Sequence, residues 1–178
     1  MKKLLLLIGF IYMCPLFAQK YMTRSAEVYF LSDKEAVELV EATNDQVGAV
    51  VDLENGNLAF QIQMRAFHFN IALMEEHFNE NYVESELYPK ATFRGAFLDL
   101  PKNLSTEQEL LVKGTMDFHG IQKEMNFSVT LSLIDDVLVG NAEFVLLCSD
   151  FGIEIPKLVA DKLANAIQVK VNARLKKI

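Results

Sequence analysis

Alternation of apolar and polar residues dominates the chain and predicts a protein built mainly of β-strands. From Leu58 to Ala66 every second residue is apolar, and Gln61, Gln63 and Arg65 lie between them. This period of two is typical of a strand with one buried face. It recurs in five later segments, at residues 91–97, 110–118, 125–133, 142–146 and 167–175.

The first part of the chain holds further candidate strands at residues 25–31 and 47–53, while residues 35–42 fit either a short strand or a short helix. Asn55-Gly56 is a hairpin-turn signal, because a positive φ costs little at these residues. Together the segments predict eight or nine antiparallel strands. We therefore predict an all-β fold with short helices, arranged as a sandwich or a closed barrel.

The least regular part of the chain is the segment 67–95. The alternation loses its phase after Ala66, which indicates a bulge or the end of a strand. Asn70 is a suitable cap for a helix over residues 71–78. The segment thus interrupts the strand pattern with a single clear helix.

Met74 and Phe78 share one face of that helix at the spacing of one turn. Tyr88-Pro89 ends the connection, since the residue before a proline leaves the helical region. We expect the segment to cover one end of a barrel, as a movable lid or a fixed plug, with His77 as its anchor. A further short helix is expected at residues 157–163.

Small residues interrupt the large apolar ones on the predicted inner faces, at Ala91, Gly95, Gly114 and Ala142. This mixture favours a closed barrel of about eight strands, which is wide enough to hold one small ligand. The small residues either leave room for that ligand or complement the large side chains in a filled core. The sequence leaves both interpretations open.

Residues 1–18 predict a secretory signal peptide, which leaves a single domain at residues 19–178. Two lysines precede an apolar run that is too short to span a bilayer, and Ala18 offers a small residue for cleavage. The alternatives are a buried N-terminal helix and a lipoprotein anchored through Cys14. Cleavage predicts a periplasmic or secreted protein without stable membrane insertion.

Charge and cysteine content narrow the range of partners. The net charge is −7, and loss of Lys2 and Lys3 leaves 15 basic against 24 acidic residues, or −9. This balance argues against nucleic acids and anionic membrane surfaces as main partners. Only Cys148 remains after cleavage, so the domain has no intramolecular disulfide. The sequence is compatible with a monomer or a homodimer.

Candidate chemistry is sparse. His68, His77 and His119 are the three histidines, but their spacing fits no metalloprotease pattern. We expect them to serve turns or caps, with His119 stabilising a hairpin. Ser149 lacks the glycine-flanked elbow of a hydrolase nucleophile, and Cys148 follows an apolar strand, where an inert buried thiol is expected. We expect no catalytic residues and no bound metal.

The acidic residues from Glu75 to Glu86 are interpreted as a solvated face. No chemistry is assigned to them.

Four motifs together resemble the YceI-like family of periplasmic proteins. They are a His-Phe pair followed by Y-P-K-A-T-F at residues 88–93, the strand and turn V-K-G-T-M-D-F-H-G at 112–120, the loop S-D-F-G-I at 149–153, and the valine-rich last strand. The chain departs from the family pattern in lacking a Trp near its start and an Arg before the Asp-Phe-Gly loop.

The resemblance implies an extended, antiparallel, lipocalin-like β-barrel that binds a long amphiphile, such as a polyisoprenoid or a fatty-acid derivative. We expect no cofactor other than such a lipid. The alternative is a filled barrel that acts as an interaction module or a metal-dependent enzyme. The predicted ligand-binding residues are the large inward and helical side chains Phe60, Ile62, Met64, Met74, Phe78, Phe93, Phe97, Met116, Phe118, Phe127 and Phe144.

Overall fold

A computed structural model describes residues 19–32, 39–155 and 165–178. The predicted signal peptide and the predicted helix at 157–163 lie outside these residues. Within the described part of the chain, no helix is both long and apolar enough to cross a membrane.

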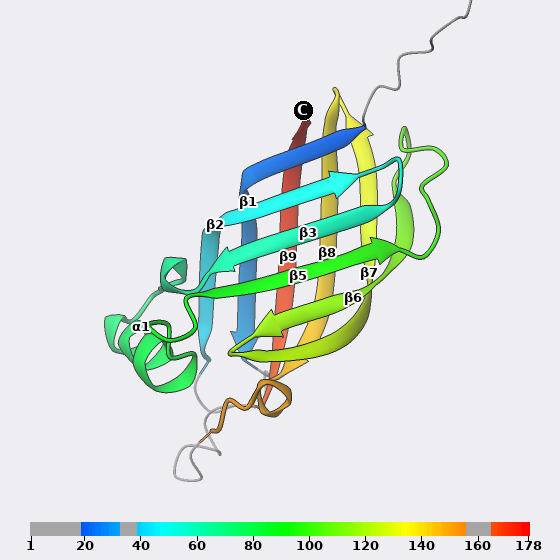
Figure 1. The fold of residues 1–178 in the computed structure, drawn as a ribbon. Coiled ribbons are helices and arrows are strands. Elements are labelled where there is room, and N and C mark those ends of the chain that lie inside the picture. The colour runs from blue at the N-terminus through cyan, green and yellow to red at the C-terminus, as the bar shows by residue number, and fades with distance from the viewer. Residues whose placement is uncertain (1–18, 33–38, 156–164) are drawn as a thin grey trace, which may run out of the picture.

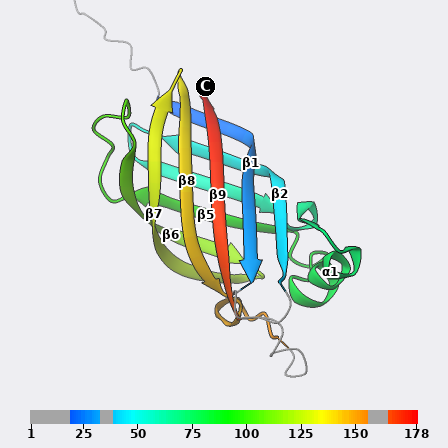
Figure 2. The ribbon, with the colours of Figure 1, turned by 180° about the vertical axis from the view of Figure 1, so that it is seen from behind.

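Eight antiparallel strands close into a barrel, the arrangement that the mixture of small and large inward residues favoured over a sandwich (Figure 1). The order is β1-β9-β8-β7-β6-β5-β3-β2, and pairing of β1 with β2 closes the circle. Seen from behind, β7, β8, β9 and β1 form the wall that faces the viewer (Figure 2). The strands are β1 (Lys20–Ser32), β2 (Glu41–Asp52), β3 (Asn57–Gln63), β5 (Lys90–Phe97), β6 (Gln108–Phe118), β7 (Ile121–Ile134), β8 (Val137–Leu147) and β9 (Ala166–Lys177).

The long strand β2 differs from the prediction of a short strand or helix at 35–42 followed by a separate strand at 47–53. It runs without interruption from Glu41 to Asp52, and residues 35–38 of the first prediction lie outside the described residues. Asn44 is fully buried, donates to the Gln63 carbonyl at 2.8 Å and accepts from the Gln46 amide at 2.9 Å. The β1–β2 register shifts beside this point. The buried Asn44 amide thus satisfies its own polar atoms by bonding to the end of β3 and to its own strand, next to the irregular register.

The strand β3 ends at Gln63, so the predicted strand through Ala66 is too long. Residues Met64–Ala66 form a single 3₁₀ turn, η1. The two-residue strand β4 (His68–Phe69) then pairs with β2. A helical turn thus accounts for the phase slip that the sequence shows after Ala66, where we expected a bulge or strand end.

The segment after β4 forms a cover at one end of the barrel, opposite the end that holds the C-terminus (Figure 1). It comprises α1 (Ala72–His77) and a π-helical turn, η2 (Phe78–Tyr82). The predicted Asn70 cap is wrong, because Ile71 occupies the cap position and makes no side-chain cap bond. The Asn70 amide donates to Glu41 instead, at 3.2 Å.

Two of the small inward residues make room for an aromatic ring. Gly95 and Gly114 are register partners across β5 and β6. A Cβ atom at Gly114 would lie 2.5 Å from the Phe93 ring and 2.6 Å from the Gly95 Cα. Since real Cβ contacts are longer, both positions require glycine, and Phe93 occupies the space above them. These two glycines therefore complement a large side chain.

Candidate functional site

An apolar cavity lies between the cover and the adjoining end of the barrel. Its volume is about 340 Å³, within the usual range for small-molecule sites. The strands β1, β6, β8 and β9, the cover and the turn η3 (Cys148–Phe151) all contribute to its wall. The lining comprises Phe30, Ser32, Val40, Phe69, Ile71, Leu73, Met74, His77, Phe78, Tyr82, Val83, Phe118, Leu146, Leu147, Cys148, Phe151, Ile153, Ile155 and Ile167.

The lining of this end cavity is predominantly apolar, and it holds no Asp, Glu, Lys or Arg side chain; His77 lies at its edge. Its other polar side chains are Ser32, Tyr82 and Cys148. Burial raises the pKa of the Tyr82 hydroxyl and the pKa of the Cys148 thiol above their ordinary values, because a low dielectric disfavours the ionised forms. Both groups therefore stay protonated at neutral pH. The cavity suits an alkyl or isoprenoid chain better than an ionic ligand.

An aromatic cluster holds the cover against the barrel. The Phe78 ring lies 5.6 Å from that of Phe30, 5.5 Å from Phe67 and 5.1 Å from Phe69, measured between ring centroids. Such offset and edge contacts add about 0.5–1.5 kcal/mol each beyond burial. Phe78 is thus both part of the cavity wall and the main attachment of the cover.

A second, narrower gap lies in the middle of the barrel, with a volume of about 60 Å³. Phe127 stands at its centre, 4.6 Å from the Phe144 ring and 5.2 Å from the Phe93 ring. Phe60, Phe127 and Phe144 point inward and yet remain only half-buried. The aromatic rings therefore narrow the barrel without filling it.

The two spaces follow one another along the same strands. Met116 lines the narrow gap, and Phe118, two residues further along β6, lines the end cavity. On β8, Phe144 and Leu146 are related in the same way. Residues two apart on one face of a strand are separated by about 7 Å. The axis of the barrel thus leads from the end cavity to the gap.

The predicted ligand-binding residues divide between the two spaces. Three of them line the end cavity, namely Met74, Phe78 and Phe118. Met64 lines neither space and is buried in η1. The remaining seven line the gap, namely Phe60, Ile62, Phe93, Phe97, Met116, Phe127 and Phe144.

Most residues that line the end cavity were not predicted from the sequence. Phe30, Leu146 and Ile167 lie near the ends of strands with alternating apolar residues. Their place in that alternation could have predicted that they face inward. Phe151 and Ile153 follow β8 in a turn, where no period applies. Only the folding of that turn across the barrel end brings them to the cavity.

The histidine that makes polar contacts to the segment behind the cover is His119 rather than the predicted His77. The His119 ring is 11% exposed and lies 3.0 Å from Glu84 and 2.9 Å from the Phe151 carbonyl oxygen. His77 is exposed at the cavity edge and makes no hydrogen bond or ion pair with the described residues. His119 therefore ties the β6–β7 turn to two other segments in addition to forming the turn itself.

Two residues of the acidic segment, which we predicted to be a solvated face, bond to other parts of the chain. Glu75 accepts from the Phe69 amide at 3.2 Å, and Glu86 pairs with Arg65 at 2.8 Å.

Among the residues with described positions, no three His, Cys, Asp or Glu side chains lie close enough together to hold a metal ion.

An eight-stranded antiparallel barrel with an apolar cavity at one end is the architecture of small lipocalin-like binding proteins. The chain matches the YceI-like domain over residues 22–175. It therefore belongs to the YceI-like family, as its motifs indicated. A search of curated proteins finds no match.

Three solved structures share the fold at low sequence identity. A polyisoprenoid-binding domain from Saccharophagus degradans has a TM-score of 0.76 and 14% identity, covering 90% of this chain and 99% of that domain. BcnA of Burkholderia cenocepacia has a TM-score of 0.72 and 16% identity, with 85% and 96% covered. A YceI protein of Campylobacter jejuni has a TM-score of 0.53 and 13% identity, with 99% and 100% covered.

Proposed function

We propose that this protein is an exported, non-catalytic carrier that holds one amphiphilic lipid, a polyisoprenoid or a fatty-acid derivative. The end cavity receives part of the chain, and the axis of the barrel takes the remainder. The apolar segment before Gln19 supports export. The polyisoprenoid-binding domain of Saccharophagus degradans, which has the same fold, supports a lipid as cargo.

The observation that carries this proposal is the predominantly apolar 340 Å³ cavity at the barrel end. Burying one methylene group is worth about 0.8 kcal/mol. A chain with about eight buried methylenes therefore gains about 6 kcal/mol, from which the cost of immobilising the ligand is subtracted. Micromolar binding needs about 8 kcal/mol, so a chain held in the end cavity alone falls short and must bury further methylenes along the barrel axis.

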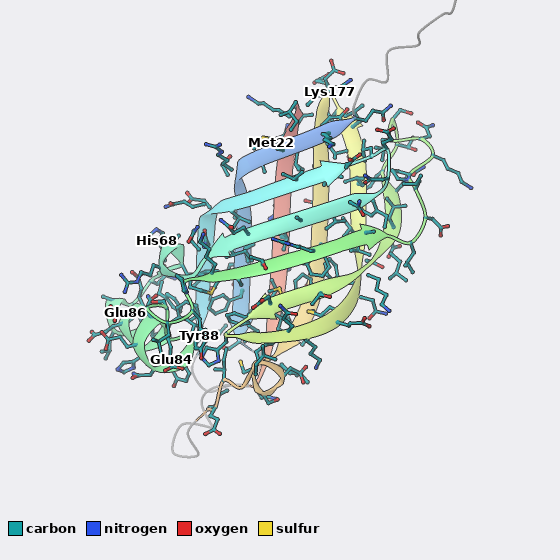
Figure 3. The ribbon with its side chains drawn as sticks, viewed as in Figure 1. Met22, His68, Glu84, Glu86, Tyr88 and Lys177 are labelled. Atoms are coloured by element: carbon teal, nitrogen blue, oxygen red, sulfur yellow. The ribbon has the colours of Figure 1, made fainter. Side chains whose placement is uncertain are left out.

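The cavity wall offers a blocking variant. Met74 is half-buried on α1 and faces the cavity. Met74→Trp adds an indole there and should displace the lipid. Met22→Trp is the matched control, because Met22 is also half-buried but lies on β1 toward the opposite end of the barrel (Figure 3).

The experiment combines native mass spectrometry of the purified protein with thermal unfolding in the presence of farnesol, a neutral isoprenoid alcohol. We expect farnesol to raise the Tm of the wild type and of Met22→Trp, since it binds the folded state. Met74→Trp should lose most of that rise. Absence of both co-purified lipid and any farnesol effect on the wild type would refute the proposal and favour a filled interaction module.

A further inference from the structure

Three segments that are distant in the sequence meet at one histidine beside the cavity. His119 lies at the tip of the β6–β7 hairpin, Glu84 follows the cover, and Phe151 ends η3. The His119 Nε2 atom lies 3.0 Å from the Glu84 carboxylate, and Nδ1 lies 2.9 Å from the Phe151 carbonyl oxygen. Figure 3 shows Glu84 and Tyr88 between the cover and the tip of this hairpin. We call His119, Glu84 and the Phe151 carbonyl the latch.

A neutral His119 and an ionised Glu84 together carry one hydrogen-bond donor too few for the two bonds of the latch. A carboxylate and a carbonyl are both acceptors, whereas a neutral imidazole has only one N–H donor. Both hydrogen bonds therefore form only if the imidazole carries two protons or if Glu84 carries one. In either arrangement the closed latch holds one proton more than a Glu84 carboxylate with a neutral His119.

Two residues of the latch have positive φ. Glu84 and His119 have φ of 44° and 51°, although neither is a glycine. At His119 this conformation belongs to the two-residue hairpin turn His119-Gly120, in which both residues have positive φ. The turn therefore places the imidazole ring independently of its bond to Glu84. At Glu84 the conformation costs about 1–3 kcal/mol, and the bond to His119 is one of the contacts that hold Glu84 in place.

Each of the three segments that meet in the latch contributes a residue to the cavity wall. Val83, Phe118 and Phe151 all line the cavity, and the first two directly precede Glu84 and His119 in the chain. The Phe118 and Phe151 rings lie 5.4 Å apart. All three side chains are buried. A change at the latch is thus transmitted to the wall through directly attached residues.

The other groups around the histidine bond to partners other than its ring. The Tyr88 ring packs at a tilt of 60° against the His119 ring, with their centroids 4.5 Å apart. Nearby in the same segments, Glu86 pairs with Arg65, Asp150 pairs with Lys123, and Asp117 accepts from the Gln122 amide at 2.9 Å. Glu84 is therefore the carboxylate that bonds to the ring.

We propose that the latch couples a proton to cargo retention. Taking up the proton closes the cavity wall around the lipid, and losing it as the pH rises loosens the wall and speeds release. The experiments below vary the pH between about 5 and 8, the interval in which histidine side chains ordinarily change charge. This inference rests on the proposed function, because it assigns regulation to the same cavity.

Glu84→Gln is the decisive variant. A glutamine amide can donate to Nε2 while a neutral His119 donates from Nδ1 to Phe151, so both bonds form without the extra proton. We expect slow release of diphenylhexatriene, an uncharged fluorescent probe, at all pH values in this variant. In the wild type, release should be about tenfold faster near pH 8 than near pH 5.

Two histidine variants separate the latch from other titrating groups. His119→Asn tolerates the left-handed backbone but does not titrate, so its release should be fast and independent of pH. His77→Asn and His68→Asn should keep the wild-type pH dependence, although His77 lies at the cavity edge and His68 lies 3.9 Å from Glu75. Loss of the pH dependence in His77→Asn, or its retention in His119→Asn, overturns the latch.

The test keeps the latch and the carrier function distinguishable. Probe binding without any pH dependence refutes the latch and leaves the carrier function standing. If no probe binds, the latch is tested by the Tm of wild type and Glu84→Gln between about pH 5 and 8. The wild type should lose Tm relative to the variant as the pH rises, and parallel curves refute the latch. Circular dichroism verifies that each variant is folded.

Discussion

Replacing Phe127 by alanine tests whether the gap in the barrel limits the length of the cargo. The ring stands between Phe93 and Phe144 at 5.2 and 4.6 Å. Truncating a buried phenylalanine costs about 3–5 kcal/mol. Since Phe127 is only half-buried, we expect a loss near the lower end, about 3 kcal/mol. The two ring contacts account for about 1–3 kcal/mol of that loss.

The variant also extends the 60 Å³ gap toward the far end of the barrel. A longer alkyl tail then gains about 0.8 kcal/mol for each additional buried methylene, less the cost of ordering it. We expect Phe127→Ala to bind hexadecanol about ten to a hundred times more tightly than the wild type does. Its affinity for decanol, which the end cavity largely accommodates, should change little.

Urea unfolding followed by circular dichroism gives the stability, and calorimetry gives both affinities. Leu133→Ala is the control, because Leu133 is half-buried on the same strand but lines neither space. It should lose about 2 kcal/mol of stability without changing the preference for chain length. The reasoning is wrong if Phe127→Ala binds hexadecanol and decanol in the same ratio as the wild type.

Two further predictions follow from pKa values raised by the fold. Burial raises the pKa of the Cys148 thiol, so iodoacetamide should label it slowly at neutral pH and faster only above the usual thiol range of about 8.5. Because Cys148 lines the cavity, bound farnesol should slow labelling further, and equal rates would place the lipid elsewhere. The hydrogen bond to Glu41, with burial, raises the pKa of Tyr29 from 10.0 to about 12. That stabilisation is complete below pH 10 and is lost as the pH rises toward 12, so Tyr29→Phe should cost at most about 1 kcal/mol in urea at neutral pH. The difference from wild type should vanish at the alkaline end, and a constant difference would contradict the assignment.

Much of the barrel wall could be predicted because strand periodicity is a local property. The alternation at residues 110–118, 125–133 and 167–175 corresponds to β6, β7 and β9, with the apolar residues facing inward. Phe60, Phe93 and Phe127 were expected inside and point into the barrel. Each side chain of a strand points to one of two faces of the sheet, so the alternation of apolar and polar residues determines which side chains face the core.

The cover was located correctly but its connections were not. The sequence placed a helix near residues 71–78, and α1 and η2 occupy residues 72–82. The choice of His77 over His119 as anchor failed because hydrogen-bond partners are set by distant segments. Glu84 and the Phe151 carbonyl reach His119 across 35 and 32 residues of chain. No local pattern carries that information.

By itself, the sequence determined the strand walls, their inward aromatic side chains and the membership of the YceI-like family. These follow from patterns within single segments and from four short motifs. Only the tertiary structure decided where the larger space lies. The larger of the two spaces is at the covered end of the barrel. In the middle of the barrel, Phe93 fills the space above Gly95 and Gly114. At the covered end, Phe30, Phe78 and Phe151 come from separate segments and leave a cavity between them. The volume left between side chains depends on how all of them meet in space.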